Sequence, residues 1–216
     1  ELAPDDAWGL HAVAHVYDMT ARSKEGLKWL EGREASWAHC NNFRYHVWWH
    51  KALMHLDIGN YAEALELYDR DIRADKTDDY RDIANAASLL SRLDLEGVDV
   101  GQRWVELADL SEKRAVDGCL AFADLHYMLS LCGGERQEAA AGLISRMATA
   151  KTELCETQRI IAHPGLRLAK GMHAFASGEY ANAWLNLRDA RADLQAVGGS
   201  HAQRDVFDRI TIEAAL

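Results

Sequence analysis

Residues that interrupt helices are scarce in this sequence, which has only 2 prolines and 15 glycines among its 216 residues. Runs that would indicate strands are nearly absent as well. Proline breaks a helix because it lacks the N–H group and its ring clashes with the preceding turn. Alanine, leucine, arginine and glutamate are abundant instead, and they lose little conformational freedom in a helix. The sequence therefore predicts an all-α fold.

The sequence also lacks paired cysteines. Its cysteines lie far apart and form no CxxC motif, so they fit neither a disulfide framework nor a thiolate zinc site. They are Cys40, Cys119, Cys132 and Cys155. This usage is typical of a reducing compartment, and we expect a cytoplasmic protein.

Long hydrophobic runs and basic clusters are missing too. No apolar run approaches the roughly 18 residues that cross a bilayer, and the start of the chain lacks the layout of a signal peptide. The formal net charge is −10, and no run of Lys and Arg stands out. Because phosphate binding needs clustered positive charge, we expect neither nucleic acid nor a membrane as a partner. Hydrophobic residues make up 49% of the chain, enough to bury a core.

Two segments near opposite ends of the chain share one pattern. Residues 59–64 and 178–183 both read glycine, polar residue, tyrosine, alanine, polar residue, alanine. The glycine accepts the left-handed conformation that ends a helix, and the tyrosine is expected to fill the wedge between two helices. The small residues Ala64 and Ala183 let these helices approach closely. The pattern resembles the tetratricopeptide repeat.

Helical spacing of apolar residues extends this pattern along the chain. It predicts a tetratricopeptide-like α-solenoid of about five antiparallel helical hairpins. We expect these hairpins at about residues 5–31, 43–74, 80–115, 119–150 and 164–196, with turns at Gly59, Gly133-Gly134 and Gly178.

Both ends of the chain carry boundary signals. Ser200 and Gln203 have the spacing of a capping box, which indicates a terminal helix over 201–216. Residues 1–6 resemble the end of one repeat followed by a proline turn into the next. We therefore interpret residues 1–216 as a single helical-repeat domain and as the C-terminal part of a longer solenoid. Upstream repeats of the same protein would then be its neighbours.

Four longer stretches resemble the tetratricopeptide repeat protein 38 family. They are His11–Tyr17, Trp29–Arg33, Phe43–His50 and Gly198–Asp205. The resemblance runs nearly from end to end of the chain, and these motifs are more specific than the general repeat pattern. It implies a helical-repeat fold and does not imply a particular activity.

Histidine is the most informative residue type, because most of the 10 histidines lie in the first 55 positions. His11 and His15 are four residues apart, as are His46 and His50. Each pair can therefore present two imidazoles on one face of a helix, an arrangement found in zinc and iron sites. His126 is a further candidate ligand, and Cys40 is a weaker one. The pattern makes a divalent metal such as zinc or iron a candidate cofactor.

A binding groove is the second candidate site. Tetratricopeptide repeats usually hold ligands on a concave face, and the expected register places one set of polar and aromatic side chains there. The set comprises Trp8, His11, His15, Arg44, His46 and Trp49, with His50 at the border. Such a groove would hold a peptide, a partner helix, a protein or a small molecule.

Several interpretations of the histidines stay open from the sequence. They are metal ligands, acid–base groups of an enzyme, contacts to a bound ligand, or packed residues bonded to neighbouring carboxylates and carbonyls. HxxxH is a weak pattern, and the glutamate of HExxH is missing. Motifs for nucleophilic catalysis are missing as well. The repeat architecture favours a binding module, and a metal-dependent or general-base enzyme is the alternative.

Two further stretches carry expectations. The insertion over residues 33–42, which contains Trp37, is either a lid or wall of a binding site or a structural plug. Arg204 and Asp205, just after the capping box, are expected to form a structural ion pair.

Overall fold

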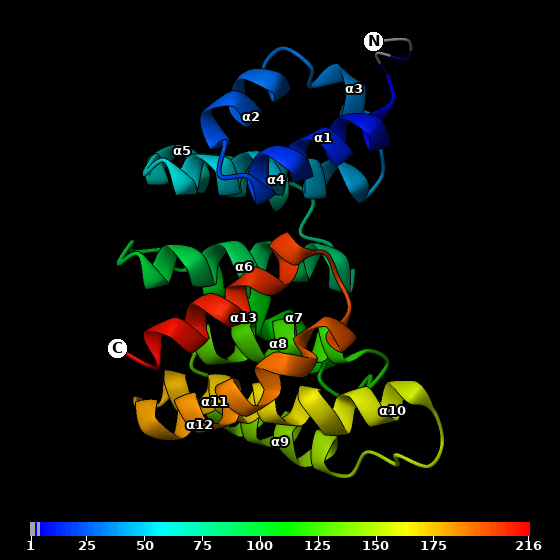
Figure 1. The fold of residues 1–216 in the computed structure, drawn as a ribbon, viewed down its shortest axis with the longest axis vertical. Helices are drawn as coiled ribbons and strands as arrows, with labels where there is room; N and C mark the ends of the chain where they lie inside the picture. Colours follow the sequence, from blue (N-terminus) through cyan, green and yellow to red (C-terminus); the bar gives the residue numbers. More distant parts are fainter. Residues whose placement is uncertain (1–2, 4) are drawn as a thin grey trace. The chain divides into compact units, whose positions relative to one another are not determined.

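The computed structural model describes residues 3 and 5–216 and divides into two compact units, residues 1–89 and residues 90–216. Every regular element among the described residues is helical (Figure 1), which confirms the all-α fold. Residues 1, 2 and 4 include the proline of the turn expected at the start of the chain, so that expectation lies partly outside the described residues.

Unit 1, residues 1–89, is built from two helical hairpins and the first part of a longer helix (Figure 1). The first hairpin pairs α1 (Ala7–Met19) with α2 (Ser23–Leu30), and α3 (Ala35–Ala38) follows it. The second pairs α4 (Phe43–Asp57) with α5 (Tyr61–Leu67), which continues into η1 (Tyr68–Ile72). Helix α4 also contacts α1 and α2. Helix α6 (Tyr80–Leu95) begins in unit 1 and continues past its boundary.

The two hairpin turns of unit 1 reverse the chain with different residues. Gly59 follows α4 with a φ of +78°, the left-handed conformation that glycine adopts without strain. The α1–α2 turn has no glycine, and Ala21 takes a φ of +53° there. Because a Cβ atom disfavours this conformation by about 1 kcal/mol, the first turn carries local strain that the second one lacks.

The insertion between the two hairpins contributes Trp37 to the core of unit 1. Trp37 of α3 is fully buried, and its ring meets the Trp48 ring edge-on at 5.1 Å. Leu30, Val47 and Met54 belong to the same buried cluster. This packing favours the structural plug over the lid for residues 33–42.

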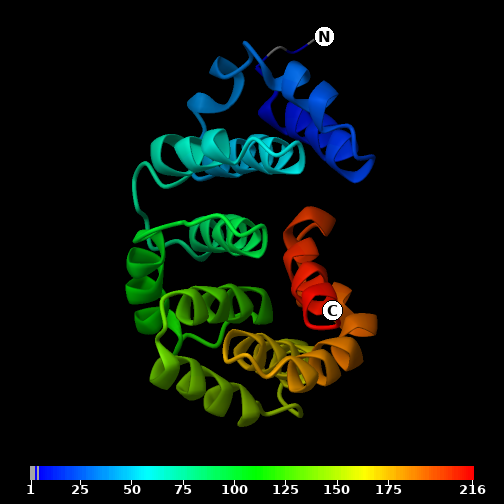
Figure 2. The same ribbon diagram turned by 90° about the vertical axis from the view of Figure 1, so that its left-hand side faces the viewer.

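Unit 2, residues 90–216, contains the remaining helices. Helices α7 (Arg103–Arg114), α8 (Ala121–Gly133) and α9 (Gln137–Ala148) pack in sequence order. The short elements α10 (Glu156–Ile160) and η2 (Ile161–Gly165) lead into α11 (Leu166–Ala176), which pairs with α12 (Tyr180–Ala190). Figure 2 shows α13 (His201–Glu213, red) beside α12 and η3 (Arg191–Val197, orange).

Close packing explains the glycine pair between α8 and α9. A Cβ atom on Gly133 would lie 2.4 Å from the ring of Trp104, and one on Gly134 would lie 2.4 Å from Ala108. The positive φ of this turn belongs to Glu135, at +57°. The two glycines therefore permit α7 to approach α8, and the chain reversal itself falls on a residue with a side chain.

The α11–α12 hairpin also depends on small residues. Ala183 is fully buried, and a Cβ atom on Gly171 would lie 2.5 Å from the Leu187 side chain. Tyr180 differs from its expected role, because it is 56% exposed and its ring lies edge-on to that of Phe175. The close approach thus comes from alanine and glycine, and the tyrosine does not fill a wedge.

The start of α13 has the expected cap. The Ser200 hydroxyl accepts a hydrogen bond from the Gln203 amide, and the Gln203 side chain accepts one from the Ser200 amide, so the capping box is confirmed. The expected ion pair of Arg204 with Asp205 is not the one observed. Arg204 donates to the backbone just before the helix, and Asp205 accepts from Arg209 at 2.6 Å.

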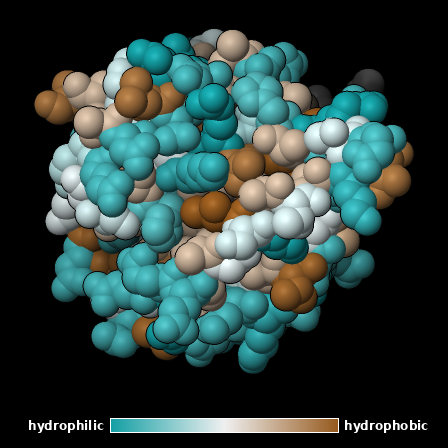
Figure 3. All heavy atoms as spheres, turned by 90° about the horizontal axis from the view of Figure 1, so that it is seen from below, coloured by the Kyte–Doolittle hydropathy of each residue, from teal (hydrophilic) through white to brown (hydrophobic). Residues whose placement is uncertain are grey.

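The surface offers few hydrophobic side chains. Among the described residues, no helix combines the length and the apolar character required to cross a membrane. Figure 3 shows one face, which is mostly hydrophilic with hydrophobic side chains in small groups. On α1, Trp8, Val16 and Met19 are 68%, 55% and 63% exposed. At 100° per residue these three positions share one face of the helix.

Candidate metal centre

Four histidines of unit 1 come together from two helices. His11 and His15 project from α1, and His46 and His50 project from α4. The spacing of four residues places each pair on one helix face, and α1 contacts α4. One potential ligand atom from each side chain lies within 4.8 Å of the other three. Among the described residues, this is the one group of three or more His, Cys, Asp and Glu side chains close enough to hold a metal ion.

The rings contact one another across the two helices as well as along them. The ring centroids of His11 and His15 are 4.4 Å apart, and those of His46 and His50 are 4.8 Å apart. Across the interface, His15 lies 4.3 Å from His50, and His11 lies 4.9 Å from His46. The four imidazoles thus form one compact cluster, which we call the four-histidine cluster.

The cluster is buried on one side. His11 and His50 are buried, whereas His15 and His46 are partly exposed. The Nε2 atom of His11 is buried and has no hydrogen-bond partner among the described residues. A buried polar atom without a partner costs about 1–3 kcal/mol. Such atoms are uncommon in protein cores, and a ligand bound at the cluster would satisfy this one.

Burial favours the neutral form of three of these imidazoles. Desolvation, with smaller contributions from His46 and His15, lowers the pKa of His11 to about 3. Desolvation also lowers the pKa of His46 to about 4 and lowers that of His15. A neutral imidazole carries the lone pair that a metal ion needs. These three imidazoles are therefore already in the protonation state of metal ligands.

Two side chains of α6 orient His46 and the neighbouring Trp49 of α4. The Nδ1–H group of His46 donates to the Oδ1 atom of the buried Asn85 at 3.0 Å. This bond leaves the Nε2 atom of His46 with a lone pair, as in metal sites whose second ring nitrogen is held by an outer residue. Trp49 stacks on His46 with ring centroids 5.2 Å apart, and its indole donates to Ser88 at 3.0 Å. Two residues of α6 thus fix two neighbouring side chains of α4.

The spacing fits a first-row divalent ion. Zinc binds imidazole nitrogen at about 2.0–2.1 Å, which places tetrahedral nitrogens about 3.4 Å apart. The ligand atoms here lie within 4.8 Å of one another, so shifts of about 1 Å through side-chain rotation bring them to bonding distance. Imidazole suits zinc, copper, iron and nickel. An all-histidine set therefore matches both the chemistry and the distances.

An aromatic wall borders the cluster. Phe43, at the start of α4, lies 5.0 Å from His11 and 6.2 Å from His46, measured between ring centroids. Trp8 stacks on Phe43 at 4.0 Å with an interplanar angle of 24°. Phe43 covers one side of the Trp8 ring, which is nevertheless 68% exposed. This wall lies beside His11 and His46.

Other residues expected at the site have different positions. Trp49 and His50 are fully buried, so they do not line an open groove or its border. Arg44 pairs with Asp75 and donates to the Cys40 carbonyl, which makes it a structural residue of unit 1. Trp49 and His50 are buried because α4 packs on several neighbours, whereas Arg44 is held by its hydrogen bond and its ion pair.

His126 lies in α8 of unit 2 and is not a member of the four-histidine cluster. Its Nδ1–H group donates to the Phe122 carbonyl at 2.7 Å, and its ring packs against Phe122 and Phe207. Burial lowers its pKa to about 4. These contacts describe a histidine packed in the core of unit 2.

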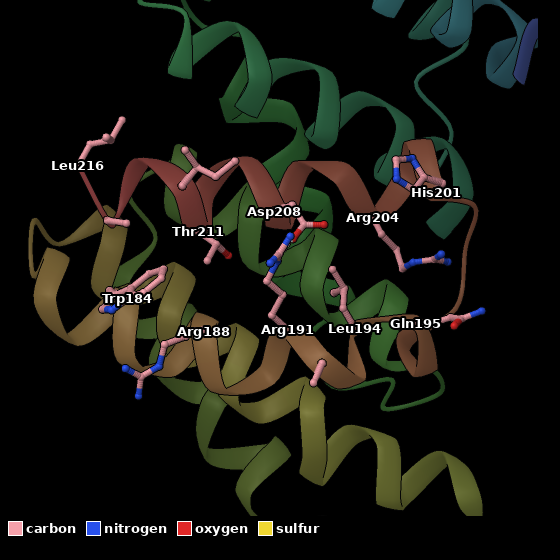
Figure 4. A pocket seen from close by; sticks show the side chains of 13 residues that line it. Trp184, Arg188, Arg191, Leu194, Gln195, His201, Arg204, Asp208, Thr211 and Leu216 are labelled. Atoms are coloured by element: carbon pink, nitrogen blue, oxygen red, sulfur yellow. Dashed lines mark hydrogen bonds and ion pairs between the residues drawn. The ribbon is translucent and has the colours of Figure 1, made fainter. Parts of the chain in front are cut away.

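Unit 2 has a groove of its own, about 740 Å³ in volume, between α12, η3 and α13. Figure 4 shows Trp184, Arg188, Arg191 and Arg204 among its lining residues. Arg191 pairs with Asp208 at 2.7 Å, Arg188 pairs with Asp189, and Arg204 donates to backbone carbonyls. The arginines of this groove are thus engaged within the protein, and the groove lacks the buried unsatisfied nitrogen of the four-histidine cluster.

Sequence reasoning identified the four histidines and missed the residues that orient them. Asn85 and Ser88 are ordinary polar positions of α6, and Phe43 is a single aromatic at a helix start. Only the packing of α6 and α1 on α4 reveals their roles.

No protein-family model matches the sequence, and no solved structure matches it significantly.

Proposed function

We propose that this protein binds one divalent transition-metal ion, zinc or iron(II), at the four-histidine cluster. The observation that carries the proposal is the convergence of four imidazoles within 4.8 Å, with a buried nitrogen of His11 left without a partner. A metal ion bound at the cluster would satisfy that nitrogen. The bond from His46 to Asn85 supports the same interpretation, since it orients Nε2 for a ligand.

The wider architecture that we propose is a tetratricopeptide-like α-solenoid related to the tetratricopeptide repeat protein 38 family. Helices α1 and α4 are the first helices of successive hairpins. In tetratricopeptide repeats these first helices line the concave face, so the repeat interpretation explains how two HxxxH pairs meet. Upstream repeats, a peptide, protein or small-molecule ligand, and a cytoplasmic location belong to the same proposal.

Metal titration tests the proposed site. The chain is stripped with a chelator and then titrated with Zn²⁺ in a calorimeter, and we expect one ion per chain. His11→Ala removes a buried ligand and should weaken binding by about 100-fold or more, beyond the 10- to 100-fold effect typical of outer residues. His39→Ala is the matched control, because His39 is an exposed histidine of unit 1 outside the cluster. Zinc binding that is absent, or equal in the two variants, would exclude the site.

A further inference from the structure

We propose that the metal ion at the four-histidine cluster takes an aromatic carboxylate as an additional ligand, with the aromatic ring lying on Trp8. This inference rests on the proposed metal site, and it names the chemical class of the molecule that the site receives. Charge, access and the neighbouring ring each support it.

Charge favours an anion. All four protein ligands are neutral imidazoles, so a bound divalent ion keeps its full charge of +2. Among the described residues, no Asp, Glu or Cys side chain joins the four histidines in this group. A partly buried, uncompensated dication attracts an anionic oxygen ligand strongly, because water screens the charge poorly there.

Access is from one side. His11 and His50 form the buried floor of the cluster, and His15 and His46 form its partly exposed rim. An exchangeable ligand therefore reaches the ion past the rim. Zinc sometimes expands its shell from four ligands to five, so all four histidines can stay bound when the carboxylate enters.

The neighbouring surface favours an aromatic group on that carboxylate. Trp8 lies beside His11, with ring centroids 5.9 Å apart, and it is 68% exposed. Phe43 stacks on one face of the Trp8 indole at 4.0 Å between ring centroids. This contact holds the indole in place for stacking of a ligand on its other face. Indole rings bind planar groups better than isolated alkyl groups of the same size when they can stack. A molecule that combines a carboxylate with a ring matches both the ion and the wall.

Cobalt(II) and benzoate test the inference on the whole chain. Co²⁺ replaces zinc in imidazole sites and reports its ligands by visible absorption. Appearance of that absorption with one Co²⁺ per chain tests the metal site by itself. Benzoate is then added, and we expect the absorption to weaken as the ion gains a fifth ligand. Acetate, which lacks the ring, should produce the same change at concentrations about 5- to 10-fold higher. Benzylamine, which has the ring and a positive charge, should produce none.

Variants of exposed residues on α1 locate the ring. Trp8→Ala should keep Co²⁺ binding and reduce the benzoate affinity to that of acetate. Met19→Ala is the matched control, since Met19 is similarly exposed on the same helix, and it should leave the preference for benzoate unchanged. Should both variants retain that preference, Trp8 is not the contact and the inference fails. It fails as well if a chain that binds Co²⁺ shows no response to benzoate, or an equal response to acetate. Absence of the Co²⁺ absorption would instead contradict the proposed metal site itself.

Discussion

His15 and His46 occupy similar positions on the rim of the cluster, but they have different neighbours. From the sequence alone, replacing either one by alanine is expected to change stability little and to weaken ligand or metal binding. The bond of His46 to the buried Asn85 changes that expectation for one of them. His46→Ala leaves the Asn85 oxygen without its donor, which costs about 1–3 kcal/mol. His15 contacts the rings of His11 and His50.

We therefore predict that His15→Ala lowers the melting temperature of the metal-free chain only slightly, whereas His46→Ala lowers it clearly. Both variants should lose at least about 10-fold in zinc affinity. Thermal unfolding with chelator, paired with zinc calorimetry, measures the two effects separately. Large destabilisation by His15→Ala with unchanged zinc affinity would contradict the prediction and show that His15 is a packing residue.

Ala21 carries the strain of the first hairpin turn. Its φ of +53° suits glycine, which takes the same role at Gly59. Ala21→Gly should raise the free energy of unfolding by about 0.5–1 kcal/mol, because relief of the left-handed strain outweighs the added freedom of the unfolded chain. The reverse change, Gly59→Ala, should lower it by a similar amount. Urea unfolding of the three proteins measures both shifts, and a destabilised Ala21→Gly variant would contradict this account of the turn.

At the scale of elements, close approach between paired helices sets the tolerance for larger side chains. Ala183 of α12 is fully buried, and its carbonyl would lie 3.3 Å from a Cβ atom placed on Gly171 of α11. Ala183→Leu should separate the two helices and cost about 1–3 kcal/mol. Ala181→Leu is the control, because Ala181 is an exposed position of the same helix. Equal melting temperatures for the two variants would show that the helices are not tightly apposed at Ala183.

The sequence predicted the helices and their ends better than it predicted the side-chain contacts between helices. Glycine at 59 and 178, the capping box at Ser200 and the spacing of the HxxxH pairs are local signals, and local signals need only the residues next to them. The burial of Trp49 and the role of Asn85 depend on α6 packing against α4, which no spacing within either helix records. Tyr180 shows the opposite error, since a residue typical of a repeat motif need not be buried in a particular hairpin.

At the scale of the whole molecule, the histidine cluster makes stability depend on pH. The pKa values of His11 and His46, about 3 and 4, lie below the usual value of 6.5. The unfolded chain therefore binds more protons than the folded chain below pH 6.5, and protonation favours unfolding. Between about pH 6 and pH 5, each of these two residues should remove about 1 kcal/mol from the free energy of unfolding of the metal-free protein.

Other groups act in the opposite direction. Burial raises the pKa values of Asp82, Asp94 and Asp124, so their contribution increases stability as the pH falls. Comparison with His11→Gln isolates the histidine effect, because this variant keeps the carboxylates and removes one titrating imidazole. Urea unfolding at pH 7, 6 and 5 should show a smaller loss for His11→Gln than for the parent chain. An equal loss would mean that His11 is not held neutral by burial.

The histidine pairs lie on helices of different hairpins, and this has a consequence for how the chain is held together. An ion bound to His15 and His46 would close a loop of about 30 residues, acting as a reversible cross-link between distant positions. That loop contains all of α2 and α3, including the buried Trp37. The metal concentration would then determine the fraction of chains in which the α1–α2 hairpin is packed on α4. In the metal-free chain, proteases would first cleave within this loop.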